Sequence, residues 1–219
     1  MSERWFLFNS ALVTGGRRGI GAAVTAALQR EGTEVQVLDL MDGFDVSDPA
    51  AWEAVGPVEL ACLNAGIGGG GDDVAGYRRM LGVNIDGVVF GVRRLQEVME
   101  PGSVIVATAS LAGLVPMPHD PIYTLTKHAV VGYIRAVAPT LAERGMRIKA
   151  VCPGFTDTPI VAPELREWVA EQGIPLMRPE QVAEAILHAA RVEETGEVWA
   201  VQPGREPVKY EFRGVPGPR

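Results

Sequence analysis

Short apolar runs rich in β-branched residues alternate with longer stretches of helical periodicity along the whole chain. This alternation predicts βαβ units around a parallel sheet, and therefore an α/β fold. The expected strands are residues 11–14, 34–39, 58–63, 103–108, 147–151 and 197–201. The expected helices are residues 19–31, 77–99, 121–144 and 179–190, with shorter ones at 49–55 and 163–172.

The length of 219 residues suits a single domain over residues 1–219. Residues 203–219 are dense in proline and glycine, which predicts an irregular tail without a fold of its own. Such a tail could be ordered against another part of the chain or against another subunit. The formal charge of −7 gives no electrostatic footprint for nucleic acid or an anionic membrane surface, so we expect a small-molecule partner.

Cysteine and histidine usage excludes two further classes. Cys62 and Cys152 each stand inside an apolar run, which predicts buried thiols and a reducing compartment rather than a disulfide scaffold. The histidines His119, His128 and His188 are too scattered for a metal cluster, so we expect no metal site.

The sequence shows neither a secretory signal nor a membrane-spanning apolar run, and the expected location is the cytoplasm.

A glycine-rich segment, GGRRGIG, joins the expected first strand directly to the following helix. Glycines there let the backbone turn tightly and approach a phosphate, while the helix N-terminus offers free N–H groups and a partial positive charge. This pattern predicts a dinucleotide phosphate site, although a turn without a ligand is the alternative. The turn residues are Gly15, Arg17, Arg18, Gly19, Ile20 and Gly21.

Asp39 ends the expected second strand, about 20 residues after the turn. An acidic side chain at this place can accept hydrogen bonds from the adenosine ribose, and it would repel a 2′-phosphate. Asp39 therefore favours NAD over NADP, whereas Arg18 is the residue that argues for NADP.

Several further motifs follow in order along the chain. They are DV at Asp45 and Val46, NAG at Asn64, Ala65 and Gly66, VNIDG around Asn84, Ser110 followed by Tyr123 and Lys127, and PGFTDT from Pro153 to Thr158. With the glycine-rich turn, they resemble the motifs of the short-chain dehydrogenase/reductase family. The stretches SLAGLVP, PIY…TKHAVVG and RIKAVCPGF are similar in particular to its 15-hydroxyprostaglandin dehydrogenase branch, whose substrates are secondary alcohols on long apolar chains.

The resemblance implies a Rossmann-like, doubly wound sheet of six or seven parallel strands in an α/β/α arrangement. It assigns adenine contact to Asp45 and Val46, and a strand-stabilising turn beside the cofactor to Asn64, Ala65 and Gly66. It places Pro153, Gly154, Thr156 and Thr158 in a loop over the nicotinamide. It also implies a homodimer or homotetramer, for which apolar positions on two helices could form the interface: Val88, Val92, Val131 and Ile134.

The resemblance makes Asn84, Ser110, Tyr123 and Lys127 catalytic, with Tyr123 and Lys127 also at the cofactor. A base must take the alcohol proton as the hydride leaves, and Tyr123 is the candidate. Lowering its pKa from about 10 to about 8 is worth about 2.7 kcal/mol. Lys127, one helical turn away, could supply on the order of 4 kcal/mol from about 4 Å. Ser110 would hold the substrate oxygen, and Asn84 would open its helix for a water in the proton relay.

Two functions remain open, an NAD-dependent oxidoreductase for secondary alcohols or ketones and a non-catalytic NAD(H)-binding regulator. Around the site, His119, Met117, Phe155 and Trp168 could border substrate or could belong to the core. The chain is compact after Asp45 and after Thr158, which predicts a short helix in the first place and a small lid in the second.

Overall fold

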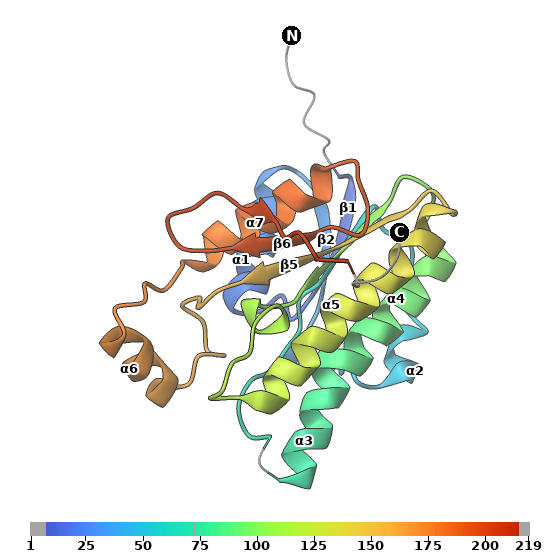
Figure 1. The fold of residues 1–219 in the computed structure, drawn as a ribbon. Helices are drawn as coiled ribbons and strands as arrows, with labels where there is room; N and C mark the ends of the chain where they lie inside the picture. Colours follow the sequence, from blue (N-terminus) through green and yellow to red (C-terminus); the bar gives the residue numbers. More distant parts are fainter. Residues whose placement is uncertain (1–7, 72, 215–219) are drawn as a thin grey trace.

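Seven strands form one sheet within residues 8–71 and 73–214, the parts of the chain that the computed structural model describes (Figure 1). Their order across the sheet is β2-β1-β3-β4-β5-β6-β7. The bounds are β1 (Ser10–Thr14), β2 (Glu34–Leu38), β3 (Leu60–Leu63), β4 (Val104–Thr108), β5 (Arg147–Pro153), β6 (Val198–Val201) and β7 (Val208–Lys209). Six strands run parallel and β7 pairs antiparallel with β6, which confirms the predicted fold class.

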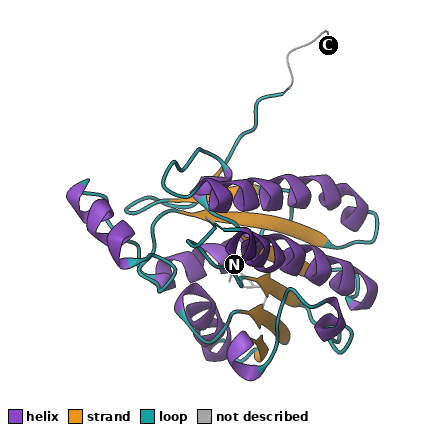
Figure 2. Ribbon diagram, turned by 90° about the horizontal axis from the view of Figure 1, so that it is seen from below, coloured by secondary structure: helices purple, strands orange, loops and turns teal. Residues whose placement is uncertain are grey.

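Helices cover both faces of this sheet (Figure 2). Because side chains alternate along a strand, Val13 and Cys62 pack toward α1 (Gly19–Arg30) and α7 (Pro179–Arg191). Leu12 and Ala61 point to the other face, where they meet the core formed by three more helices. These are α2 (Pro49–Trp52), α4 (Gly87–Val98) and α5 (Pro121–Ala142). The short α2 agrees with the compactness expected after Asp45.

The sheet is doubly wound, because β1 lies between β2 on one side and β3 on the other. The chain thus reverses its direction of travel across the sheet at β1. In open α/β sheets, ligands bind at the carboxyl ends of the strands beside such a switch point. The glycine-rich turn after Thr14 occupies that position.

The expected helix over residues 77–99 is three consecutive segments. These are α3 (Val74–Leu81), a π-helical turn η2 (Gly82–Asp86) and α4. Asn84 stands inside the π-helical turn, fully buried. Its side-chain bonds to neighbouring segments favour a wider turn there, as expected from a polar residue that disturbs the helical ladder.

The C-terminal tail differs from the expected irregular segment. Val208 pairs with Ala200, and Tyr210 N–H donates to the Val198 carbonyl at 2.8 Å. The two-residue β7 covers the edge of β6, whose backbone groups would otherwise lack strand partners on that side. Residues 215–219 of the predicted tail lie outside the described residues.

The remaining short elements surround the carboxyl edge of the sheet. They are the 3₁₀ turns η1 (Leu40–Asp42) and η3 (Leu111–Gly113) and the helix α6 (Pro163–Glu171). α6 projects away from the sheet at one end of the molecule (Figure 1). It is the segment after Thr158 for which the sequence predicted a small lid, and that role stays a prediction.

Candidate active site

The glycine-rich turn needs its glycines for two separate reasons. Gly15 and Gly19 have φ angles of 64° and 53°, in the left-handed region that side chains disfavour. A Cβ on Gly21 would lie 2.1 Å from the Gly15 carbonyl oxygen, so the start of α1 packs directly on the turn. The turn therefore leaves the N-terminus of α1 beside a tightly folded backbone, a geometry that fits a pyrophosphate.

The other turn residues lie in different surroundings. Ile20 is half-buried and packs against the core between the sheet and α7. Arg18 is exposed at the N-cap position of α1. The Arg17 guanidinium is paired with Asp42, at 2.7 Å from Nε and 3.0 Å from Nη2. Of the two arginines expected near phosphate, Arg17 thus already has a carboxylate partner.

Asp39 lies one residue beyond β2 rather than within it, and only 8% of it is exposed. Its Oδ2 accepts from Arg17 N–H at 3.0 Å, and its Oδ1 accepts from Met41 N–H at 3.0 Å. The carboxylate therefore joins the glycine-rich turn to η1. This places it beside the turn, where the sequence predicted a ribose acceptor.

The DV pair makes local contacts in the structure. The Asp45 carboxylate accepts from Ser47 N–H at 2.9 Å and from its hydroxyl at 2.7 Å. Val46 is buried, and its carbonyl accepts from the Trp52 indole at 2.9 Å. The pair thus fixes the loop before α2, and adenine contact stays a prediction.

The NAG segment is bonded to the end of β1. The Thr14 hydroxyl accepts from the backbone N–H of Asn64 at 2.9 Å and of Ala65 at 3.0 Å. The Asn64 amide donates to the Thr14 carbonyl at 3.3 Å. These bonds hold the loop after β3 against the glycine-rich turn, a role that the sequence analysis gave to Asn64 but not to Thr14.

Three adjacent elements bring Ser110, Tyr123 and Lys127 together. Ser110 follows β4 and caps η3, where its hydroxyl accepts from Ala112 N–H at 3.1 Å. Its side chain also hydrogen-bonds that of Tyr123, which stands in the first turn of α5. Lys127 lies one turn further along α5, with its Nζ 5.5 Å from the centre of the Tyr123 ring.

Burial dominates the acid–base properties of this group. It raises the pKa of Tyr123 to about 12, against a smaller lowering by the Ser110 hydrogen bond. It lowers the pKa of Lys127 to about 8. The Tyr123 pKa is thus raised by desolvation, and its lowering by Lys127 stays a prediction.

Asn84 joins the loop after β3 to α5. Its amide donates to the Ile67 carbonyl at 2.9 Å and to the Thr126 hydroxyl at 3.1 Å, while its oxygen accepts from Ile67 N–H. A Cβ on Gly66 would lie 3.4 Å from both the Asn84 oxygen and the Lys127 Nζ. Both side chains therefore flank Gly66, and a water relay beside them stays a prediction.

The loop after β5 returns to the glycine-rich turn. The side chain of Thr156 donates to the Gly154 carbonyl at 3.0 Å, and Gly154 N–H donates to the Val201 carbonyl at 2.9 Å. A Cβ on Gly19 would lie 3.0 Å from Thr158 Cγ2, so the loop from Pro153 onward closes on that turn. The residues predicted for phosphate and for nicotinamide are thus neighbours.

Aromatic rings connect the loop before α5 to α6. The His119 ring lies 4.5 Å from that of Trp168, and Phe155 lies 6.4 Å from it. Arg166 pairs with Asp157 at 2.6 Å and fixes α6 to the loop after β5. These rings therefore join α6 to the two neighbouring loops. Met117, on the loop before α5, is held instead by its N–H bond to the Thr124 hydroxyl at 3.2 Å.

Asp120 is a site residue that the sequence analysis missed. Its Oδ1 accepts from Tyr123 N–H at 2.8 Å, and its Oδ2 accepts from Gly69 N–H at 2.9 Å. It thereby caps α5 and ties the glycine-rich loop GIGGGG to the helix that carries Tyr123. The Asp-Pro pair at the helix start was the available signal.

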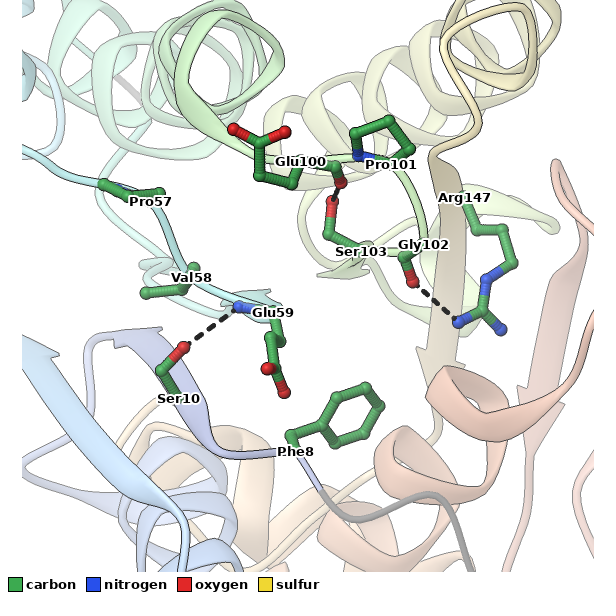
Figure 3. A pocket seen from close by; sticks show the side chains of 10 residues that line it. All are labelled: Phe8, Ser10, Pro57, Val58, Glu59, Glu100, Pro101, Gly102, Ser103 and Arg147. Carbon is green, nitrogen blue, oxygen red and sulfur yellow. Dashed lines mark hydrogen bonds between the residues drawn. The ribbon is translucent and has the colours of Figure 1, made fainter.

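A hollow of about 480 Å³ lies at the opposite, amino-terminal edge of the sheet (Figure 3). Its polar groups are mostly bonded to one another. Glu59 N–H donates to the Ser10 hydroxyl at 3.2 Å, and Arg147 donates to the Gly102 carbonyl at 3.3 Å. The hollow is therefore separate from the residues of the candidate active site.

Four other expectations concern residues outside this site. Val88, Val92, Val131 and Ile134 are at most 5% exposed and belong to the core, so the expectation that they form a subunit interface is wrong. Cys62 and Cys152 are buried free thiols, as predicted. Among the described residues, no cluster of potential metal ligands occurs, and no helix is long and apolar enough to span a membrane.

Comparison with known proteins identifies the class. Residues 44–204 match the family model described as enoyl-(acyl carrier protein) reductase. Cis-4-hydroxycyclohexanecarboxylate dehydrogenase of Sinomonas cyclohexanicum is 33% identical, over 82% of this chain and 88% of its own. The NAD(+) 15-hydroxyprostaglandin dehydrogenase of Bos taurus is 29% identical, over 69% of each chain.

A solved short-chain dehydrogenase/reductase from Brucella melitensis has the same fold. The two structures superpose with a TM-score of 0.75 at 25% sequence identity. The match covers 90% of this chain and 95% of the Brucella chain. The protein is thus an oxidoreductase with a nucleotide-binding Rossmann fold. It belongs to the short-chain dehydrogenase/reductase family, as the motifs predicted.

Proposed function

We propose that the protein is an NAD-preferring dehydrogenase that interconverts a secondary alcohol and its ketone. The observation that carries this proposal is the convergence of Ser110, Tyr123, Lys127 and Asn84 beside the glycine-rich turn. A regulator that only senses NAD(H) has no chemical need for a hydroxyl, a phenol and a buried amine in one cluster. The enzyme is therefore favoured over the regulator.

Each of the four side chains would have its own role in the reaction. Ser110 and Tyr123 share a hydrogen bond and can both bond the substrate oxygen, with Tyr123 taking the proton during oxidation. Lys127 donates to the Thr108 carbonyl at 3.1 Å, which keeps its amine near the phenol. A water held near Asn84 would connect to Lys127 and pass the proton outward. The nicotinamide supplies the hydride acceptor when it is bound.

The described residues fit a dinucleotide. The backbone contact of Gly21 with the turn leaves α1 available to the pyrophosphate, and the Asp39 carboxylate beside that turn would accept from a ribose hydroxyl. Asp39 would also repel a 2′-phosphate, which supports NAD. Asp45, Val46, Asn64, Ala65 and Gly66 and the loop of Pro153, Gly154, Thr156 and Thr158 complete the proposed cofactor site.

The proposed substrate is a small alcohol or ketone. Both named relatives are dehydrogenases whose substrates carry a hydroxyl group, one on a cyclohexane ring. The aromatic rings of α6 and its neighbouring loops would border such a substrate. Assembly as a homodimer or homotetramer remains part of the proposal, through surfaces other than the four core residues.

A thermal melt with NADH and with NADPH tests the cofactor site, and NADH formation from cis-4-hydroxycyclohexanecarboxylate tests the reaction. Ligand at one hundred times its dissociation constant stabilises by about 2.7 kcal/mol. For a chain of this size we expect an increase in melting temperature of roughly 5–11 °C with NADH. No increase with either dinucleotide would overturn the proposal.

A further inference from the structure

Arg17 lies next to the carboxylate expected to select the cofactor. Its backbone N–H donates to Asp39 Oδ2 at 3.0 Å, so the two residues are in direct contact at the turn. In dinucleotide sites of this kind, a nearby arginine can accommodate the 2′-phosphate that distinguishes NADP. Arg17 is thus a potential NADP-binding cation in a site that Asp39 adapts to NAD.

Asp42 holds that cation in place. Its two oxygens accept from Nε and Nη2 of Arg17 at 2.7 and 3.0 Å, a two-point contact along one edge of the guanidinium. The pairing lowers the pKa of Asp42 and raises that of Arg17, so both groups are charged. Asp42 ends η1, the turn that Asp39 caps, which fixes both carboxylates relative to Arg17.

We propose that Asp42 is a specificity-determining residue for the cofactor, because it holds the Arg17 guanidinium away from the ribose 2′ position and so disfavours NADP(H). The proposal rests on the dinucleotide site argued above. Two carboxylates would then discriminate between NAD(H) and NADP(H): Asp39 acts on the ribose, and Asp42 acts through Arg17.

The size of the effect follows from exposure. The side chains of Arg17 and Asp42 are 52% and 41% exposed, so the pair is a solvent-screened one that a competing phosphate can disrupt. Removing Asp42 should free Arg17 and also remove one repelling charge. We expect D42A to tighten NADPH binding about fivefold to tenfold and to change NADH binding less than about twofold.

A double-mutant cycle tests this directly. Dissociation constants for NADH and NADPH are measured by calorimetry on the wild type, D42A, R17A and D42A/R17A. In the R17A background, D42A should bring little further gain for NADPH. E53A, which removes an exposed carboxylate at the end of α2, is the matched control and should leave the ratio of the two constants unchanged.

The possible outcomes distinguish a failure of the Asp42 proposal from a failure of the proposed function. An unchanged NADPH-to-NADH ratio in D42A would overturn the proposal, and so would an equal gain from D42A with and without Arg17, since that would be repulsion alone. If the wild type bound neither dinucleotide, the proposed function itself would fail. If the wild type binds NADH normally but the NADPH-to-NADH ratio does not change in D42A, only the role of Asp42 would be overturned.

Discussion

Lys127 Nζ lies 5.5 Å from the centre of the Tyr123 ring and donates to the Thr108 carbonyl at 3.1 Å, deep in the protein. Burial lowers the pKa of Lys127 to about 8 and raises that of Tyr123 to about 12. For both groups, the effect of burial is thus larger than any stabilisation that the charge of one gives to the other. The positive charge of an oxidised nicotinamide would supply the attraction that Lys127 alone does not.

The lowered pKa of Lys127 predicts a pH-dependent contribution to stability. The buried ammonium opposes folding below about pH 8, and this cost disappears as the pH rises toward about 10.5, because the folded state loses the proton first. The unfolding free energy of the wild type should thus rise relative to that of K127M by up to about 3 kcal/mol. Denaturant titrations of both proteins across this interval measure the difference, and a constant difference would contradict the assigned pKa.

Asp120 should position Tyr123 and influence its proton affinity. The negative charge of Asp120 raises the pKa of Tyr123, and its carboxylate caps α5. D120N can keep the cap but removes the charge, so the rise of kcat/KM for alcohol oxidation should move to lower pH. D120A should in addition lose about 1 kcal/mol of stability. If the pH dependence of kcat/KM is the same in D120N as in the wild type, Asp120 acts only structurally.

Gly21→Ala should abolish dinucleotide binding. Its Cβ would meet the Gly15 carbonyl oxygen at 2.1 Å, and a backbone atom cannot move aside without opening the turn. Calorimetry with NADH is the measurement. Gly132→Ala is the control, because Gly132 is exposed on α5 with open space around it. That change should raise the unfolding free energy by about 0.5–1 kcal/mol and leave NADH affinity unaltered.

The two thiols should resist alkylation in the folded protein. Burial raises the pKa of both Cys62 and Cys152 to about 12, and the thiolate is the reactive form. Iodoacetamide should label neither residue under native conditions and both after denaturation, as read by mass spectrometry. Rapid native labelling of either cysteine would contradict the packing of the strand that carries it.

The sequence was sufficient to predict what depends on local patterns. The alternation of strands and helices, the turn at Gly15 and the one-turn spacing of Tyr123 and Lys127 are all properties of neighbouring residues. Contacts between distant segments could not be predicted, because they depend on how loops fold onto the sheet edge. The pairing of Arg17 with Asp42 and the bond from Gly69 to Asp120 are of this kind.

The helix surfaces show a second limit. Val88, Val92, Val131 and Ile134 were candidates for a subunit interface, yet the structure buries them in the core on one face of the sheet. An apolar stripe on a helix indicates that it packs against something. It does not tell whether the partner is the chain's own sheet or another subunit, and here it is the sheet.

The central claim is that Tyr123 is the proton-transferring group, and Tyr123→Phe tests it most directly. NADH formation from cis-4-hydroxycyclohexanecarboxylate and related secondary alcohols is compared in the wild type and the variant, with NADH affinity measured for both. Turnover should fall by roughly 10²- to 10⁴-fold while NADH affinity is retained. Equal turnover in the two proteins would contradict the assignment.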